Sequence, residues 1–82
     1  MRKEIPVNDQ AFISLQFIEN PEGSAKKFTL SKSVQQEGIL FEERMSCDHK
    51  DTLMCEYQYF DEKKAMEFWK HAIKKAMATS TL

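Results

Sequence analysis

The sequence predicts an α+β fold, in which a four-stranded antiparallel β-meander is followed by one C-terminal amphipathic α-helix packed on one sheet face. Two observations support this prediction. Between the turn-forming stretches NPEGS (20–24), QQEG (35–38) and DHKD (48–51), apolar residues alternate with period two, as in strands that bury one face. After Phe60 the apolar spacing lengthens to that of a helix.

The predicted strands span residues 12–19, 27–34, 39–47 and 52–60. Each carries apolar residues at alternate positions: Ile13, Leu15 and Phe17; Phe28, Leu30 and Val34; Ile39, Phe41, Met45 and Cys47; Leu53, Cys55, Tyr57 and Tyr59. Closing the predicted loops places Phe17 opposite Phe28, and Phe28 opposite Met45. All four apolar sets then lie on one side of the sheet, which supports the meander because a one-residue slip would reverse a strand.

Residues 61–78 are predicted to form the helix. Asp61 is a suitable N-cap, and apolar residues recur at helical spacing: Ala65, Phe68, Trp69, Ala72, Ile73, Ala76 and Met77. The alanines leave room for close approach to the sheet. Residues 1–10 are expected to form a loose N-terminal arm and residues 79–82 a loose tail, with 1–82 as a single small domain.

Composition narrows the class of protein. The chain has 82 residues, of which 41% are apolar and 30% charged, with a net charge of −1. No apolar run approaches the roughly 18 residues of a membrane span, and the first ten residues lack the apolar region of a secretory signal. Two cysteines are too few for a disulfide-stapled domain. We therefore expect a cytoplasmic protein with reduced thiols and no membrane association.

The stretch SCDHKDTLMC contains two cysteines and one histidine, which are the ligand types of zinc sites. In the predicted hairpin, Cys55 lies four strand residues, or about 13 Å, from the loop that holds His49, which is too far for a shared metal. A disulfide between Cys47 and Cys55 would be strained at best. We therefore predict a hairpin with buried thiols, no metal and no cofactor.

Glu43 falls on the apolar face of its strand, opposite Tyr57 and on the same face as Lys32. A carboxylate there marks either a functional pocket or a partly exposed part of the face. The sequence contains no recognisable arrangement of nucleophile and base and no glycine-rich phosphate loop. We expect that the protein is not an enzyme.

The opposite face of the predicted sheet is richer in apolar residues than solvation requires, and its edge strands are free to pair. The sequence therefore predicts a small interaction or regulatory protein that binds a protein partner, most simply a second copy of itself. The residues assigned to this interface are Phe12, Ile18, Leu40, Met54 and Phe60.

The alternative function is binding of single-stranded nucleic acid by the basic face of the helix. The residues assigned to it are Lys63, Lys64, Lys70, Lys74 and Lys75. Residues 61–82 contain five lysines and three acidic residues, which is a weak basic bias for a nucleic-acid binder. Binding to a protein partner is therefore the favoured hypothesis.

Overall fold

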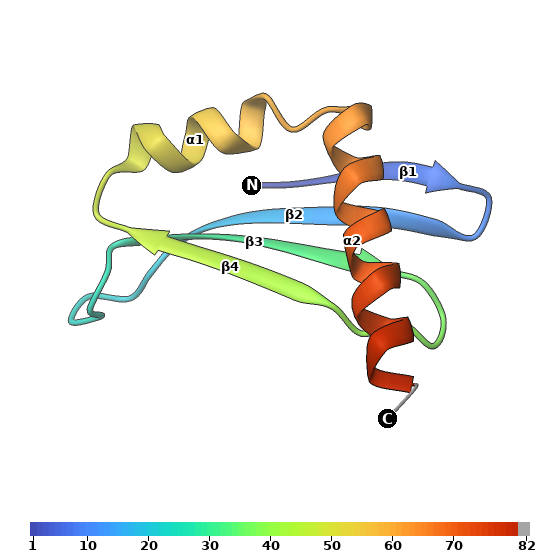
Figure 1. The fold of residues 1–82 in the computed structure, drawn as a ribbon. Helices are drawn as coiled ribbons and strands as arrows, with labels where there is room; N and C mark the ends of the chain where they lie inside the picture. Colours follow the sequence, from blue (N-terminus) through green and yellow to red (C-terminus); the bar gives the residue numbers. More distant parts are fainter. Residues whose placement is uncertain (81–82) are drawn as a thin grey trace.

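A computed structural model describes residues 1–80, with side chains to residue 78. Four strands precede two helices: β1 (Arg2–Asn8), β2 (Ala11–Glu19), β3 (Phe28–Gln35), β4 (Glu42–Cys47), α1 (Lys50–Gln58) and α2 (Glu62–Ser80). The strands form one sheet in the order β1-β2-β3-β4, with every neighbouring pair antiparallel. Both helices lie over the same face of this sheet, and α2 runs across the strands (Figure 1). The predicted α+β class and meander order are confirmed.

Two of the three predicted turns, at residues 20–24 and 35–38, connect strands of the sheet. The β2–β3 and β3–β4 loops contain Gly23 and Gly38, whose φ angles of 91° and 79° are accessible to glycine at little cost. The observed register places Phe17 opposite Leu30, and Leu30 opposite Met45. Both pairings differ from the predicted register by two residues. An even shift keeps every side chain on its predicted face, because the side-chain period of a strand is two.

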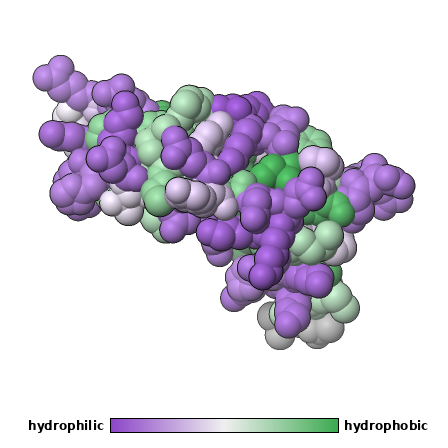
Figure 2. All heavy atoms as spheres, turned by 90° about the horizontal axis from the view of Figure 1, so that it is seen from above, coloured by the Kyte–Doolittle hydropathy of each residue, from purple (hydrophilic) through white to green (hydrophobic). Residues whose placement is uncertain are grey.

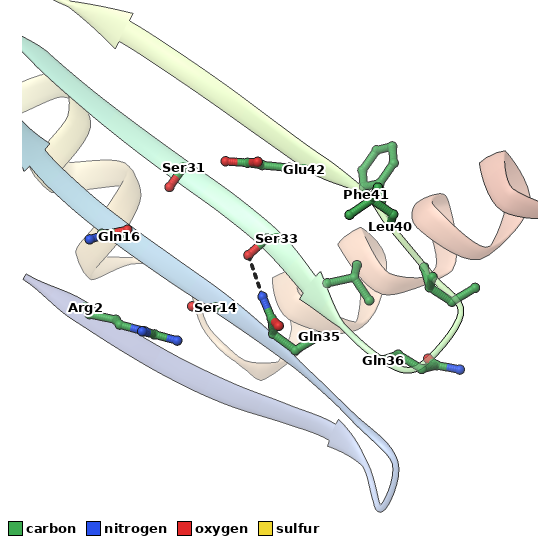
Figure 3. Close-up of a pocket in the computed structure, with 12 residues that line it drawn as sticks. Arg2, Ser14, Gln16, Ser31, Ser33, Gln35, Gln36, Leu40, Phe41 and Glu42 are labelled. Atoms are coloured by element: carbon green, nitrogen blue, oxygen red, sulfur yellow. Dashed lines mark hydrogen bonds between the residues drawn. The ribbon is translucent and has the colours of Figure 1, made fainter.

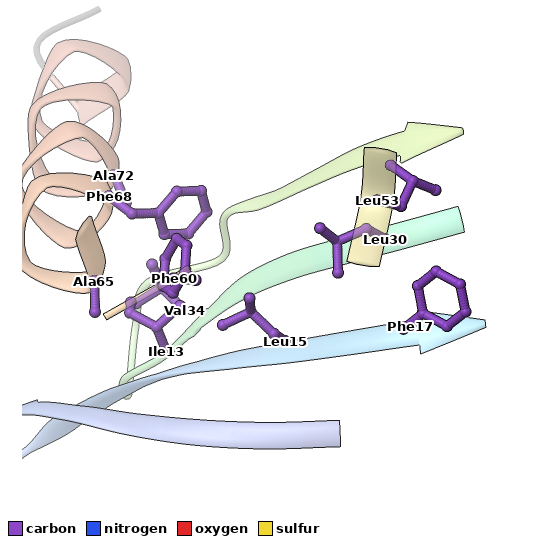
Figure 4. Packing of buried hydrophobic residues seen from close by; sticks show 10 residues of the cluster. All are labelled: Ile13, Leu15, Phe17, Leu30, Val34, Leu53, Phe60, Ala65, Phe68 and Ala72. Atoms are coloured by element: carbon purple, nitrogen blue, oxygen red, sulfur yellow. The ribbon is translucent and has the colours of Figure 1, made fainter. Parts of the chain in front are cut away.

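The hydrophobic core lies between the sheet and the two helices (Figure 4). Residues from β2, β3, α1 and α2 contribute to it, together with Phe60 of the α1–α2 link. Its buried members are Ile13, Leu15, Phe17, Leu30, Val34, Leu53, Phe60, Ala65, Phe68 and Ala72. Burial of these apolar side chains is the main favourable term that holds the helices to the sheet.

The prediction that residues 1–10 form a loose arm is wrong, because Arg2–Asn8 forms edge strand β1. Ile5 and Val7 alternate with exposed residues and pack against the core. The segment is short and charged, and it contains Pro6. A proline is nevertheless compatible with an edge strand, where one row of backbone N–H groups has no partner.

The prediction of a fourth strand over residues 52–60 is also wrong, because Lys50–Gln58 forms helix α1 and His49 is its N-cap. Apolar residues here satisfy both periods: Leu53, Tyr57 and Tyr59 stand at alternating positions, whereas Leu53, Tyr57 and Phe60 recur at i, i+4 and i+7. The surrounding lysine, glutamate, glutamine and methionine residues favour a helix. The predicted 48–51 hairpin loop is therefore a strand-to-helix connection.

The predicted helix at 61–78 corresponds to α2, Glu62–Ser80. Ala65 and Ala72 are fully buried, which confirms that small residues occupy the contact between this helix and the rest of the core. Met77, which was assigned to the apolar face, is instead 63% exposed. The predicted tail 79–82 overlaps the end of α2 at residues 79 and 80, and residues 81 and 82 lie outside the described residues.

Asp61 caps α2. Its Oδ1 accepts a hydrogen bond from the backbone N–H of Lys64 at 3.0 Å. This bond is the main reason that the pKa of Asp61 is lowered from its ordinary value, against an opposing contribution from desolvation. A lowered carboxyl pKa stabilises the folded protein above the unfolded-state pKa, and this contribution is lost as the pH falls through the folded-state pKa.

We therefore expect Asp61→Ala to lower the Tm by about 5 °C at pH 7, since an unmade N-cap weakens the first turn of α2. The Tm difference from wild type should narrow as the pH falls below about 4. Thermal unfolding followed by circular dichroism at several pH values measures both effects. Asp61→Asn is the matched control, because it keeps a neutral capping group: its Tm difference from wild type at pH 7 should be smaller than that of Asp61→Ala and should narrow over the same pH range, since the wild-type carboxylate is what titrates. A constant difference for Asp61→Ala would contradict a role of the ionised carboxylate.

Candidate functional site: the β4 edge

Strand β4 is the least protected strand of the sheet. Five of its six residues are exposed, from Glu42 to Ser46, and only Cys47 is partly buried. Met45, which points to the helix side, is 42% exposed, and Leu40, just before the strand, is fully exposed at 100%. At the opposite edge, Ile5 and Val7 of β1 pack against the core, and α2 lies over β1. The side chains of β4 are therefore more exposed than those of β1, which alternate between exposed and partly buried.

The backbone of β4 offers hydrogen-bonding groups to a further strand. The N–H of Val34 donates to the carbonyl oxygen of Phe41 at 3.0 Å, which fixes the phase of the β3–β4 ladder. Because hydrogen-bonded and non-bonded pairs alternate, Glu43, Met45 and Cys47 direct their backbone groups toward β3. Glu42, Arg44 and Ser46 then direct theirs away from the sheet. These three residues form the free edge.

The β1 edge has features that oppose strand addition. The N-terminal nitrogen and the carbonyl oxygen of Met1 bond to the backbone of Phe17 at 3.1 and 2.8 Å, which sets the phase of the β1–β2 ladder. By the same alternation, Pro6 occupies a position whose N–H would point to the free edge, and proline has none. The register also shifts between Pro6 and Asn8. Proline and bulges are common protections of edge strands, and β4 contains neither.

The two faces of β4 present different sets of side chains. On the face without helices, Arg44 Nε donates to Glu42 Oε1 at 2.8 Å. On the helix side, Glu43 Oε1 lies 3.8 Å from His71 Nε2 of α2. Phe41 packs edge-on against His71, with ring centroids 5.4 Å apart. Along the segment 41–45 the helix side thus presents aromatic, acidic and thioether groups, and the open side presents an acid and a base.

The face of the sheet without helices is polar. Figure 3 shows Ser14 and Gln16 of β2 beside Ser31 and Ser33 of β3, with Arg2 and Glu42 on the two edge strands. These residues line part of an open depression of about 340 Å³. Seen from above in the orientation of Figure 1, the molecule is mostly hydrophilic, and apolar groups reach the surface in separate places (Figure 2). No large apolar patch is seen from that side.

The residues predicted to form a protein interface do not lie together. Phe12 and Ile18 are on the open face of β2, and Leu40 precedes β4. Phe60 is buried at 6% exposure, and Met54 is partly buried against the core. The assignment of Met54 and Phe60 to an exposed face is wrong, because it required residues 52–60 to be a strand.

The five lysines assigned to nucleic-acid binding are all exposed on α2: Lys63, Lys64, Lys70, Lys74 and Lys75. They lie on the side of the helix away from the core residues Ala65 and Ala72 or on its flank. Glu67 lies among them. The basic face that the alternative function would use is therefore exposed.

Lys32 and Glu43 face each other across β3 and β4. The ammonium group of Lys32 lies 5.7 Å and 5.6 Å from the ring centroids of Phe60 and Phe68. Glu43 is exposed rather than buried and does not face Tyr57, because Tyr57 is in α1. Glu43 therefore occupies a partly exposed position at the edge of the sheet.

The two cysteines are free. Cys47 Sγ is 3.3 Å from the carbonyl oxygen of His49, whereas Cys55 is exposed on α1, so the prediction that both thiols are buried is wrong for Cys55. Within residues 1–80 no group of three or more histidine, cysteine or acidic side chains is placed to hold a metal ion. Neither described helix is both long and apolar enough to cross a bilayer.

Sequence reasoning missed Glu42, Arg44 and Met45 as site residues, because it placed their strand inside the sheet beside a fourth strand. The signal that could have identified them is the pattern FEERM, in which complementary residues flank a central glutamate. Comparison with protein-family models, with curated proteins and with solved structures found no match to this chain.

Proposed function

We propose that this protein is a small, non-enzymatic interaction protein that forms a homodimer through the edge of β4. The observation that supports the proposal is the combination of a free backbone edge with exposure on both faces of β4. An unpaired edge strand is a template for another strand, which supplies main-chain hydrogen bonds to it. The partner strand would also cover Met45 and Leu40.

The choice of β4 over β1 rests on the difference between the two edges. Pro6 and the register shift hinder strand addition at β1, whereas β4 has neither feature. A second copy joined at β4 would extend the four-stranded sheet to eight strands, and the helices of both copies would lie on the same side of this sheet. The small size of the domain also favours association, since a small chain buries a limited fraction of its surface alone.

Sedimentation velocity of the wild-type protein between about 1 and 500 μM tests the proposal, with a concentration-dependent dimer as the expected result. Arg44→Pro should abolish this dimer while the monomer stays folded. Proline at position 44 removes an N–H that points away from β3, so the β3–β4 ladder is retained.

Arg44→Ala is the matched control, because it removes the side chain and keeps the backbone N–H. It should weaken the dimer without abolishing it. A protein that stays monomeric over this range would contradict the homodimer. A dimer that persists in folded Arg44→Pro would contradict the role of the β4 edge.

A further inference from the structure

We infer that β4 pairs antiparallel with β4 of a second copy in one specific register, with Glu43 of each copy on the two-fold axis. This inference rests on the proposed function and adds the alignment of the two strands. It follows from the phase of the backbone, from the faces to which the side chains point, and from a comparison of the possible registers.

The backbone phase limits the registers. The residues with outward backbone groups are Glu42, Arg44 and Ser46, and each must bond to another outward residue of the second copy. A two-fold axis perpendicular to the sheet also keeps the helices of both copies on one face. An even-numbered residue of one copy must therefore lie opposite an even-numbered residue of the other, and an odd-numbered residue opposite an odd-numbered one. In such a register the two-fold axis passes through a pair of identical residues, one from each copy.

The central registers can be compared by their side-chain pairs. An axis at Glu42 or at Arg44 places two like charges in direct opposition on the open face, without a reciprocal opposite-charge pair. An axis at Met45 places Glu42 opposite Asp48, again with like charge. Like charges directly opposed across strands are destabilising.

An axis at Glu43 gives complementary pairs on both sides. Glu42 lies opposite Arg44 of the second copy, and Arg44 lies opposite its Glu42, so the open face carries two reciprocal ion pairs. On the helix side, Phe41 lies opposite Met45 in both directions. The sequence FEERM thus matches itself when one copy is reversed. Aromatic–aliphatic and opposite-charge cross-strand pairs both stabilise antiparallel sheets.

The cost of this register is the pair of Glu43 carboxylates on the axis. Each carboxylate has a histidine from its own copy nearby, since Glu43 Oε1 lies 3.8 Å from His71 Nε2. Lys32 is the cross-strand neighbour of Glu43 in β3. Both Glu43 side chains stay partly exposed, so water and these bases reduce the repulsion.

Opposite effects of two adjacent glutamates follow from this register. Glu42→Gln should raise the dimer Kd about fivefold, because both reciprocal ion pairs are lost. Glu43→Gln should lower the Kd about threefold, because the like-charge pair on the axis is removed. Sedimentation equilibrium measures both values. A Kd that changes in the same direction for the two variants would overturn the register.

Cysteine cross-linking gives a second, geometric test in a Cys47→Ser, Cys55→Ser background. Glu43→Cys should form an intermolecular disulfide, because opposed Cα atoms in a non-hydrogen-bonded pair are about 4.5 Å apart. Met45→Cys is the matched control. In the inferred register the two copies of residue 45 are offset by four residues, or about 13 Å, so no disulfide should form.

The outcomes separate this inference from the proposed function. Cross-linking at residue 43 and not at residue 45, by non-reducing electrophoresis under mild oxidation, supports the register. If the wild-type protein dimerises but the Met45→Cys variant cross-links, or neither cysteine variant cross-links, the register is overturned and the proposed homodimer still stands. A wild-type protein without any dimer overturns both.

Discussion

Leu53→Ala should lower the free energy of unfolding by about 3 kcal/mol, a large part of the stability of a domain of this size. Leu53 is fully buried and projects from α1 toward Leu30 of β3 (Figure 4). Truncation to alanine removes apolar contacts and leaves a cavity between helix and sheet. The Tm should fall by about 12 to 20 °C, measured by thermal unfolding with circular dichroism.

Cys55→Ala is the control for this substitution. Residue 55 is exposed on the opposite side of α1, and its change should alter the free energy of unfolding by less than about 0.5 kcal/mol. A strand over residues 52–60 would place residues 53 and 55 on the same face. Similar losses for both variants would therefore contradict the helix, whereas a large loss at Leu53 alone supports it.

Ala65→Leu should destabilise the protein by about 2 to 3 kcal/mol through overpacking. Ala65 is fully buried where α2 packs against the rest of the core, so a larger side chain must push the helix outward or displace its neighbours. Trp69 reports on this movement, because its Nε1 donates a hydrogen bond to Gln36 Oε1 at 2.8 Å. Chemical unfolding and the emission maximum of this single tryptophan are the measurements.

Lys70→Leu introduces the same side chain on the exposed side of α2 and is the control for Ala65→Leu. It should change the free energy of unfolding by less than about 0.5 kcal/mol and leave the tryptophan emission unaltered. If Ala65→Leu were as mild as this control, the contact between α2 and the rest of the core would be looser than the burial of Ala65 implies.

The sequence was informative where side-chain period and turn residues agree. Ile13, Leu15 and Phe17 on β2, and Leu30 and Val34 on β3, were assigned to the core face and are buried there. The register differed by two residues, and the side-chain pattern does not detect this error because it repeats every two residues. Only the exact length of each loop, which depends on backbone conformation at glycines such as Gly23, fixes the alignment.

The two wrong elements have separate physical causes. Residues 50–58 satisfy the strand and the helix period at once, so the packing of Leu53 and Tyr57 against the sheet decides between them. Residues 2–8 are mostly polar, and their strand is stabilised by pairing with β2 rather than by their own pattern. These two errors compensated in the strand count, because β1 supplied the fourth strand that α1 did not.

The candidate site was least predictable. An edge strand is defined by the absence of a neighbour, and the neighbour was assigned incorrectly. Once residues 52–60 are a helix, the charged pair Glu42 and Arg44 lies at the boundary of the sheet. The side-chain pattern of β4 alone does not distinguish an inner strand from an outer one.

The contact between α2 and β1 joins the last helix of the described chain to its first strand. Every β-pairing joins strands that are neighbours in sequence, so the hairpins require only short loops to close and should form early in folding. The part of the core next to β1, by contrast, is covered by α2, the last helix to be synthesised. During synthesis the meander would therefore leave the ribosome with apolar side chains such as Ile13 still uncovered, and this interval is when the chain is most open to aggregation or to binding by a chaperone.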